Sequence, residues 1–266
     1  MRLAKLAVAS VSPTVGAVKS NVSRLIAVAK EMADANVTIG AFPEQAIGGY
    51  PPEDLVQWPG FLVGQRQQLE RFAKETSGAP TVYVIGLAVS AGGQIFNAAA
   101  VVHRGRVAGV VPKEKLPTYN VFYEGRTFSR GGPGLALDWG GIPLGDYRFQ
   151  FDFGDVAVEV CEDAWSPDGP MRRRCYSGSE IVVNVSTSPY RNVSRTFPME
   201  SVPTPNSVSS TAIEISTRLR NTDCRGRPVP CSNSPRMRAF RTQYSICGRF
   251  APVSRMTSGV RPCSWW

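Results

Sequence analysis

Residues 156–165, VAVEVCEDAW, form an apolar run that ends on a cysteine and then becomes polar. Alternating valines over this length predict a buried strand, and the polar residues after Cys161 predict a turn. The strand would present the thiol of Cys161 at the edge of a sheet, where a substrate can reach it. A buried cysteine is more often a small apolar residue than a nucleophile, so this interpretation depends on the residues that accompany it.

A histidine is the usual activating partner of a cysteine nucleophile, and the chain has one, His103. It lies in residues 101–107, VVHRGRV, which predict a hairpin between two strands. We interpret His103 as a solvated residue at the end of a strand. We therefore expect a carboxylate or a lysine to activate Cys161.

Two other apolar runs end on such groups. Residues 37–44, VTIGAFPE, predict a strand that leads to Glu44, and residues 107–113, VAGVVPK, predict one that leads to Lys113. Strands that end on a carboxylate, an ammonium and a thiol can bring all three together at one edge of a sheet. We expect Glu44, Lys113 and Cys161 to share a dry, enclosed pocket, where large pKa shifts arise.

Four stretches around these residues carry a family resemblance. They are residues 42–55, FPEQAIGGYPPEDL; 113–124, KEKLPTYNVFYE; 160–165, VCEDAW; and 184–190, NVSTSPY. They resemble the nitrilase superfamily of carbon-nitrogen hydrolases, with its Glu-Lys-Cys triad, and within it the glutaminase domain of glutamine-dependent NAD synthetases. The resemblance implies an α/β fold, the α-β-β-α sandwich of that superfamily, which we expect to be incomplete here.

The resemblance also implies a reaction. Cys161 would attack the carboxamide of L-glutamine through a thioester intermediate, Glu44 would carry the proton, and Lys113 would stabilise the oxyanion. Loss of any one of the three should slow the reaction by at least about 100-fold. The ammonia would serve an ATP-dependent synthetase domain that amidates deamido-NAD.

Further roles follow from the same resemblance. The backbone N–H of Glu162 would contribute to the oxyanion hole, Tyr119 and Ser188 would contact glutamine, and Glu124 would support Lys113. The alternatives are a packing ring for Tyr119, a turn former for Ser188 and a surface charge for Glu124.

Lys115 is a second candidate for the ammonium of the triad. We prefer Lys113, because the family places its lysine four residues before a proline, which here is Pro117.

Periodicity predicts an α/β order of elements before and after the three candidate residues. Apolar spacing predicts helices over 17–35 and 61–76. Alternation predicts strands over 3–12, 81–89, 95–103, 106–111, 147–153, 156–161 and 181–186. Pro170 predicts the first turn of a short helix, in which Arg172-Arg173-Arg174 would form a solvated face rather than a phosphate or nucleic-acid patch.

The composition changes at residue 194. Residues 194–266 contain 11 Arg, 12 Ser and three acidic residues, a charge of 11 − 3 = +8, whereas residues 1–193 carry 19 − 18 = +1. Apart from a stretch around 212–219, no helical or strand period is present. We predict a partial hydrolase domain over 1–193 and a basic tail over 194–266 that is out of frame or disordered. The alternatives are a genuine tail that contacts nucleic acid or membrane lipid, or a disulfide-bearing extension.

The remaining expectations concern partners and location. We expect L-glutamine as substrate, a synthetase domain normally in cis, a homo-oligomer in the complete protein, and no nucleic acid or membrane partner. No metal site is predicted, and ATP and Mg²⁺ are expected only for the synthetase domain, because no Ser-Gly-Gly phosphate loop occurs in this chain. No signal peptide is recognised, which favours the cytoplasm. The alternative functions are a stand-alone amidase for another small amide and a non-catalytic basic binding protein.

Overall fold

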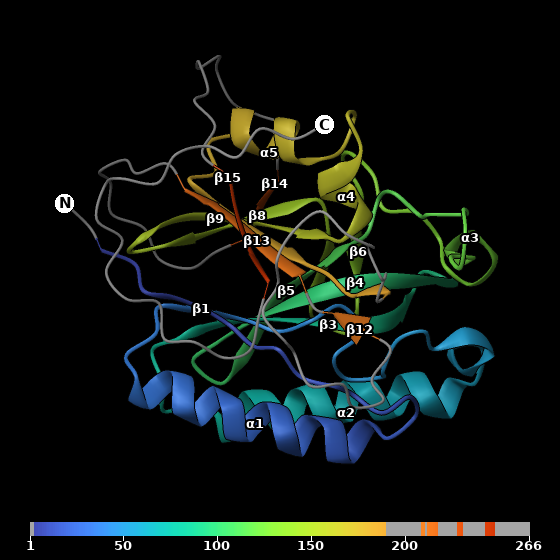
Figure 1. Cartoon of the computed structure of the whole chain (residues 1–266), viewed down its shortest axis with the longest axis horizontal. Helices are drawn as coiled ribbons and strands as arrows, with labels where there is room; N and C mark the ends of the chain where they lie inside the picture. The colour runs from blue at the N-terminus through green and yellow to red at the C-terminus, as the bar shows by residue number, and fades with distance from the viewer. Residues whose placement is uncertain (1–2, 190–208, 211, 218–227, 231–242, 248–266) are drawn as a thin grey trace, which may run out of the picture.

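Two β-sheets lie between layers of helix in the part of the chain that the structure describes (Figure 1). The computed structural model describes residues 3–189, 209–210, 212–217, 228–230 and 243–247. The first sheet has the strand order β1-β2-β3-β4-β5-β7-β6. In chain order its strands are β1 (Leu6–Val8), β2 (Ile39–Ala41), β3 (Val82–Ala91), β4 (Gln94–His103), β5 (Arg106–Pro112), β6 (Ala136–Asp138) and β7 (Pro143–Gly145).

The second sheet has the order β14-β8-β9-β10-β13-β15. Its strands are β8 (Tyr147–Phe151), β9 (Gly154–Val160), β10 (Ile181–Val185), β13 (Ala212–Thr217), β14 (Pro228–Pro230) and β15 (Gln243–Cys247), and a separate pair joins β11 (Ser188–Pro189) to β12 (Ser209–Ser210). The central strands β9 and β10 are parallel, with Val160 opposite Val185. The two strands therefore end at the same level.

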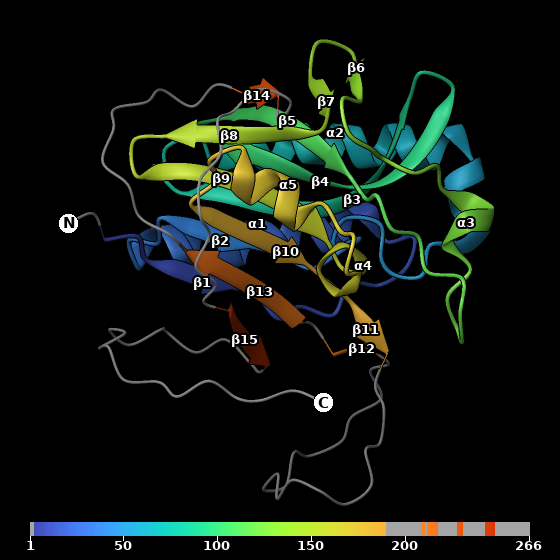
Figure 2. The same ribbon diagram turned by 90° about the horizontal axis from the view of Figure 1, so that it is seen from above.

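Helices cover the outer faces of the two sheets. α1 (Val18–Asp34) and α2 (Pro59–Glu75) lie side by side against the first sheet, and α5 (Met171–Tyr176) lies over the second (Figures 1 and 2). The buried residues of α1 recur at helical spacing: Val22, Leu25, Ile26, Ala29 and Met32. The shorter helices are η1 (Glu53–Gln57), α3 (Glu124–Thr127) and α4 (Glu162–Trp165). The predicted α-β-β-α sandwich is confirmed.

An apolar core fills the space between the sheets. Val84 and Val111 of the first sheet and Val158 and Val183 of the second belong to one cluster and have no exposed surface. β-branched side chains pack well on a pleated sheet, and each one buried contributes about 1.5–3 kcal/mol. This core holds the two sheets together beside the site.

The strand directions bring several chain segments to one edge of the sandwich. β2 is parallel to β3, and both β3 and β5 are antiparallel to β4, so β2 and β5 run in the same direction. Glu44 and Lys113 follow the ends of β2 and β5, and Cys161 follows β9. The strand ends therefore position the predicted triad.

The predicted helices are confirmed within two residues at each end, but some strands differ from the prediction. The strand expected over 3–12 is only β1, because its pairing with β2 covers three residues. β6 and β7 were not predicted, since strands of three residues are too short to show alternation.

The predicted solvated face of Arg172-Arg173-Arg174 is wrong for Arg174. Its side chain has no exposed surface and donates hydrogen bonds to the carbonyl of Val158 (2.6 Å) and to Asp146 (3.1 Å). α5 packs against β9, and a helix of six residues is too short for the sequence to show which side faces inward.

The position of His103 at the end of a strand is confirmed, but the residue is less solvated than expected. It is half-buried at the end of β4, its ring stands edge-on to Phe151 with centroids 5.4 Å apart, and burial lowers its pKa. Asn97, which lies beside Lys113, is six residues away along the same strand, roughly 20 Å. His103 is therefore at the other end of the sheet from the strand ends that carry the triad.

The predicted boundary at residue 193 stays a prediction. β12 to β15 come from beyond it, and β13 lies in the stretch where the sequence retained some alternation. Residues 190–208, 211, 218–227, 231–242 and 248–266 lie outside the described residues. Among the helices of the described segments, none has the length and apolar character needed to cross a membrane.

Candidate active site

Cys161 occupies a strained turn between β9 and α4. Its φ is +47° and its ψ is −101°, a conformation that costs a non-glycine residue about 1–3 kcal/mol. The turn is held in place because the N–H of Cys161 donates to the carbonyl of Val185 (2.8 Å), and the side-chain amide of Asn184 donates to the carbonyl of Cys161 (3.1 Å). The thiol is therefore fixed by hydrogen bonds between β9 and β10.

Glu44 lies in the loop after β2 and is completely buried. Its Oε2 accepts a hydrogen bond from the N–H of Thr187 (3.1 Å), and its carbonyl accepts one from the Thr187 hydroxyl (3.0 Å). A Cβ at Gly86 would lie 2.5 Å from the Cα of Glu44, so this approach of β3 requires glycine. Contacts to both sheets thus fix the carboxylate.

Lys113 connects two carboxylates. Its Nζ lies 2.8 Å from Oε1 of Glu44 and 2.9 Å from Oε1 of Glu124, and its side chain is 1% exposed. Burial opposes the charge, but the neighbouring carboxylates outweigh burial and raise the pKa of Lys113 well above its usual value. The site therefore contains a permanent, fixed ammonium.

Glu124 is the first residue of α3 and is 5% exposed. Burial raises its pKa to about 7, although Lys113 acts in the opposite direction, and Glu44 adds to the increase. The Tyr50 hydroxyl donates to its Oε1 (3.2 Å). Glu124 is thus a buried group whose charge changes near neutral pH.

Asn97 and Tyr50 are members of this site that the sequence reasoning missed. The amide of Asn97 donates to Oε1 of Glu44 (2.7 Å) and to Oε1 of Glu124 (3.3 Å), and accepts from Gln45 (2.8 Å). A single asparagine in the apolar strand of residues 95–102, IFNAAAVV, was the available signal. Such a residue is buried only if it has polar partners.

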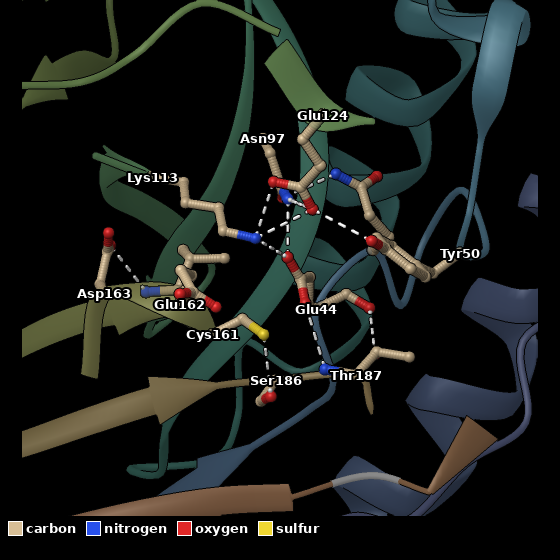
Figure 3. Close-up of polar contacts among 12 residues, drawn as sticks. Glu44, Tyr50, Asn97, Lys113, Glu124, Cys161, Glu162, Asp163, Ser186 and Thr187 are labelled. Carbon is tan, nitrogen blue, oxygen red and sulfur yellow. Dashed lines mark hydrogen bonds and ion pairs between the residues drawn. The ribbon is translucent and has the colours of Figure 1, made fainter. Parts of the chain in front are cut away.

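The Cys161 thiol lies beside this group of charges (Figure 3). Its side chain is buried, and burial and the carboxylate of Glu44 raise its pKa, while Lys113 acts in the opposite direction. The Ser186 hydroxyl donates to the sulfur (3.2 Å). The sulfur is therefore a protonated thiol at neutral pH and needs a base before it can act as a nucleophile.

Comparisons with known proteins identify the family. The family model for carbon-nitrogen hydrolase matches residues 5–234. The chain belongs to the carbon-nitrogen hydrolase family.

Two sequence relatives of this carbon-nitrogen hydrolase are described as glutamine-dependent NAD(+) synthetases. The glutamine-dependent NAD(+) synthetase of Aquifex aeolicus is 36% identical over 185 residues, which cover 70% of this chain and 30% of that protein. The synthetase of the same description from Xanthomonas campestris is 37% identical over 191 residues, covering 70% of this chain and 32% of that protein. The chain thus spans about a third of the length of these relatives.

Solved structures share the fold. A glutamine-dependent NAD(+) synthetase from Cytophaga hutchinsonii matches with a TM-score of 0.62 at 19% identity, over 80% of this chain and 38% of that one. The glutamine-dependent NAD(+) synthetase from Acinetobacter baumannii, in complex with adenosine diphosphate, matches with a TM-score of 0.56 at 30% identity. The match covers 70% of this chain and 33% of that one. An amidase from Nesterenkonia matches with a TM-score of 0.54 at 18% identity. The match covers 73% of this chain and 68% of that one.

The other residues predicted for this carbon-nitrogen hydrolase lie as follows. The hydroxyl of Tyr119, which is 48% exposed, donates to Oε2 of Glu162 (2.7 Å), and Glu162 directly follows Cys161 in the chain. Ser188 is the first residue of β11, but its side chain lies outside the described part of the chain. Lys115 is paired with the exposed Asp168 (2.5 Å) rather than with Glu44. Within the described residues no group of His, Cys, Asp and Glu side chains could hold a metal ion.

Proposed function

We propose that this chain is the glutamine amidohydrolase part of a glutamine-dependent NAD synthetase. The observation that carries the proposal is the fixed ammonium of Lys113, held between Glu44 and Glu124 beside the Cys161 thiol. Hydrolysis of a carboxamide needs a nucleophile, a proton carrier and a positive charge at the oxyanion, and a thiol, a carboxylate and an ammonium can supply them. The sequence relatives support glutamine as the substrate.

The first step is the attack on the carboxamide. Glu44 removes the proton from the Cys161 thiol, and the sulfur forms a bond to the carboxamide carbon of glutamine. The carbonyl π electrons move to the oxygen, and the ammonium of Lys113 and the N–H of Glu162 stabilise the negative charge. Because burial holds the pKa of the thiol high, this transfer depends on Glu44.

The second step releases ammonia. Glu44 returns its proton to the nitrogen, the carbon-nitrogen bond breaks, and ammonia departs from a glutamyl thioester on Cys161. Glu44 then removes a proton from water, the hydroxide adds to the thioester carbon, and the carbon-sulfur bond breaks to give glutamate and the thiol. One carboxylate thus serves as base and acid in both half-reactions.

The hydrogen-bonded side chains of Tyr119 and Glu162 provide substrate recognition in this proposal. The carboxylate of Glu162 attracts the α-ammonium of glutamine, and Tyr119 and Ser188 supply further hydrogen bonds. In the complete protein, which we place in the cytoplasm and expect to be a homo-oligomer, the ammonia passes to a synthetase domain in cis. ATP and Mg²⁺ belong to that domain.

The test is ammonia release from a panel of amides by the chain as it stands, with glutamine beside asparagine, acetamide and butyramide. We expect release from glutamine that disappears in Cys161→Ala and persists in Cys175→Ala, since Cys175 is a second described thiol, outside the site. Release from the simple amides but not from glutamine would identify a stand-alone amidase. Release that is unchanged in Cys161→Ala would contradict the mechanism.

A further inference from the structure

Lys113 and Cys161 come from different sheets. β5, which leads to Lys113, belongs to the first sheet, and β9, which leads to Cys161, belongs to the second. No backbone ladder joins these two described strands, because β5 pairs with β4 and β7, and β9 pairs with β8 and β10. Apolar packing between the sheets is non-directional, and the hydrogen bonds from Thr187 that join the sheets reach Glu44 rather than Lys113. A directional contact is needed to fix the two strand ends relative to one another.

The Asp163 carboxylate supplies that contact. Its Oδ1 accepts hydrogen bonds from the N–H groups of Glu114 (3.0 Å) and Lys115 (2.8 Å), the two residues that follow Lys113. Its Oδ2 accepts one from the N–H of Val160 (3.2 Å), the residue before Cys161. One side chain thus joins the backbone next to the ammonium to the backbone next to the thiol.

The environment of Asp163 fits this role. The side chain is 1% exposed, and burial raises its pKa to about 6, while the Arg174 guanidinium opposes that increase. Arg174 in turn donates to the carbonyl of Val158 (2.6 Å) in β9 and lies 3.4 Å from Oε1 of Glu114. Arg174 therefore links the same two segments a second time, beside the Asp163 carboxylate.

We infer that Asp163 is a positioning residue that sets the separation of Lys113 and Cys161 for the proposed reaction. The inference rests on the proposed function, but it is an inference about geometry and has its own measurement. Without the carboxylate, three backbone N–H groups lose their acceptor, and the turn that carries the sulfur moves relative to the ammonium. A displacement of about 1 Å at a reacting group costs about 100-fold in rate.

Two variants at residue 163 give a graded test. Asp163→Asn keeps one oxygen acceptor but turns an N–H₂ group toward another donor, so we expect a decrease of about tenfold in kcat for glutamine hydrolysis. Asp163→Ala removes both carboxylate oxygens, and we expect kcat to decrease by about 100-fold. KM should change less than about threefold, because Glu162 and Tyr119 keep their mutual hydrogen bond.

Alkylation of Cys161 by iodoacetamide gives a readout that does not need turnover. The tryptic peptide 149–172 contains Cys161 and not Cys175, so mass spectrometry reports this thiol alone. We expect the rate constant of alkylation at Cys161 to be highest in the wild type, lower in Asp163→Asn and lowest in Asp163→Ala, which is the order expected for kcat. The matched control is Asp168→Asn, the same substitution just after α4 at a side chain that is 81% exposed, and its alkylation rate should equal that of the wild type.

Stability is measured in the same samples by thermal unfolding, with Tyr83→Phe as a control that loses a buried hydrogen bond to Ala29 (2.9 Å) at the helix layer. Slower alkylation in Asp163→Asn but not in Tyr83→Phe, at temperatures where both are folded, supports positioning. Wild-type alkylation rates and kcat in a folded Asp163→Asn overturn it. If the wild type releases no ammonia but alkylation still falls at residue 163, the proposed function fails and the positioning role stands.

Discussion

Two clusters of buried charge lie next to one another in this molecule. The lysine cluster consists of Glu44, Asn97, Lys113, Glu124 and the thiol of Cys161. The arginine cluster consists of two carboxylates and two guanidinium groups, those of Glu114, Asp146, Arg173 and Arg174. Lys113 of the lysine cluster and Glu114 of the arginine cluster are neighbours along the chain.

The two clusters differ in how their charges are matched. In the arginine cluster two guanidinium groups face the carboxylates, and Asp146 accepts from both Arg173 (2.9 Å) and Arg174 (3.1 Å). In the lysine cluster one ammonium serves two carboxylates, and the pKa of Glu124 is raised to about 7 by burial. A matched cluster is static, whereas an unmatched one retains a proton that can move. We therefore expect substitutions in the arginine cluster to change stability and those in the lysine cluster to change rate.

The largest effect is expected at the nucleophile. Cys161→Ala should lower kcat for glutamine hydrolysis by about 10⁴-fold or more, because no other group forms the thioester. The temperature of unfolding should change little, since a small apolar side chain replaces a buried thiol. The measurement is ammonia release beside thermal unfolding. Residual activity within tenfold of the wild type would place the nucleophile elsewhere.

The next effect is on stability and lies in the arginine cluster. Arg174→Met should lower the free energy of unfolding by about 3–5 kcal/mol, because it leaves buried carboxylate charge without its partner. The control is Arg172→Met in the same helix, whose side chain is exposed over the Tyr176 ring. It should change the free energy by less than about 0.5 kcal/mol. Urea unfolding measures both variants. If Arg174→Met and Arg172→Met lower the free energy of unfolding by the same amount, the buried ion pairs of Arg174 do not contribute to stability.

A smaller effect is expected at the base. Glu44→Gln keeps the shape of the side chain but cannot accept the thiol proton, so kcat should fall by about 100-fold or more. Glu53→Gln is the control, because Glu53 is an exposed residue of the same sequence stretch. The comparison is made by ammonia release at one pH. A Glu44→Gln variant as active as Glu53→Gln would remove Glu44 from the mechanism.

The smallest effect is a dependence on pH. The pKa of Glu124 is raised to about 7 by burial, so the carboxylate is ionised above pH 7 and takes up a proton below it. Protonation removes one of the two charges that hold Lys113. We expect kcat/KM for glutamine to decrease as pH is lowered through 7, by at most about tenfold per pH unit. In Glu124→Gln, kcat/KM at high pH should be lower than in the wild type, and the decrease through pH 7 should be absent. A Glu124→Gln variant with the pH profile of the wild type would show that Glu124 does not cause the decrease.

The contrast between the clusters also explains what could be predicted from sequence. Glu44, Lys113 and Cys161 each end an apolar run, so the pattern of strands and the family resemblance located them together. Asn97 interrupts an apolar strand, but one polar residue does not reveal its partner. Arg174 was expected in solvent, because Asp146 and Glu114 lie 28 and 60 residues away along the chain and no local pattern connects them.

In the proposed mechanism, Cys161 carries the glutamyl group. The most direct test mixes the chain with glutamine, quenches with acid within one turnover, and analyses the tryptic peptides by mass spectrometry. We predict a glutamyl thioester on the peptide 149–172 that is absent from Cys161→Ala. Ammonia release with no adduct on that peptide, or with the adduct on the peptide that contains Cys175, would contradict the claim.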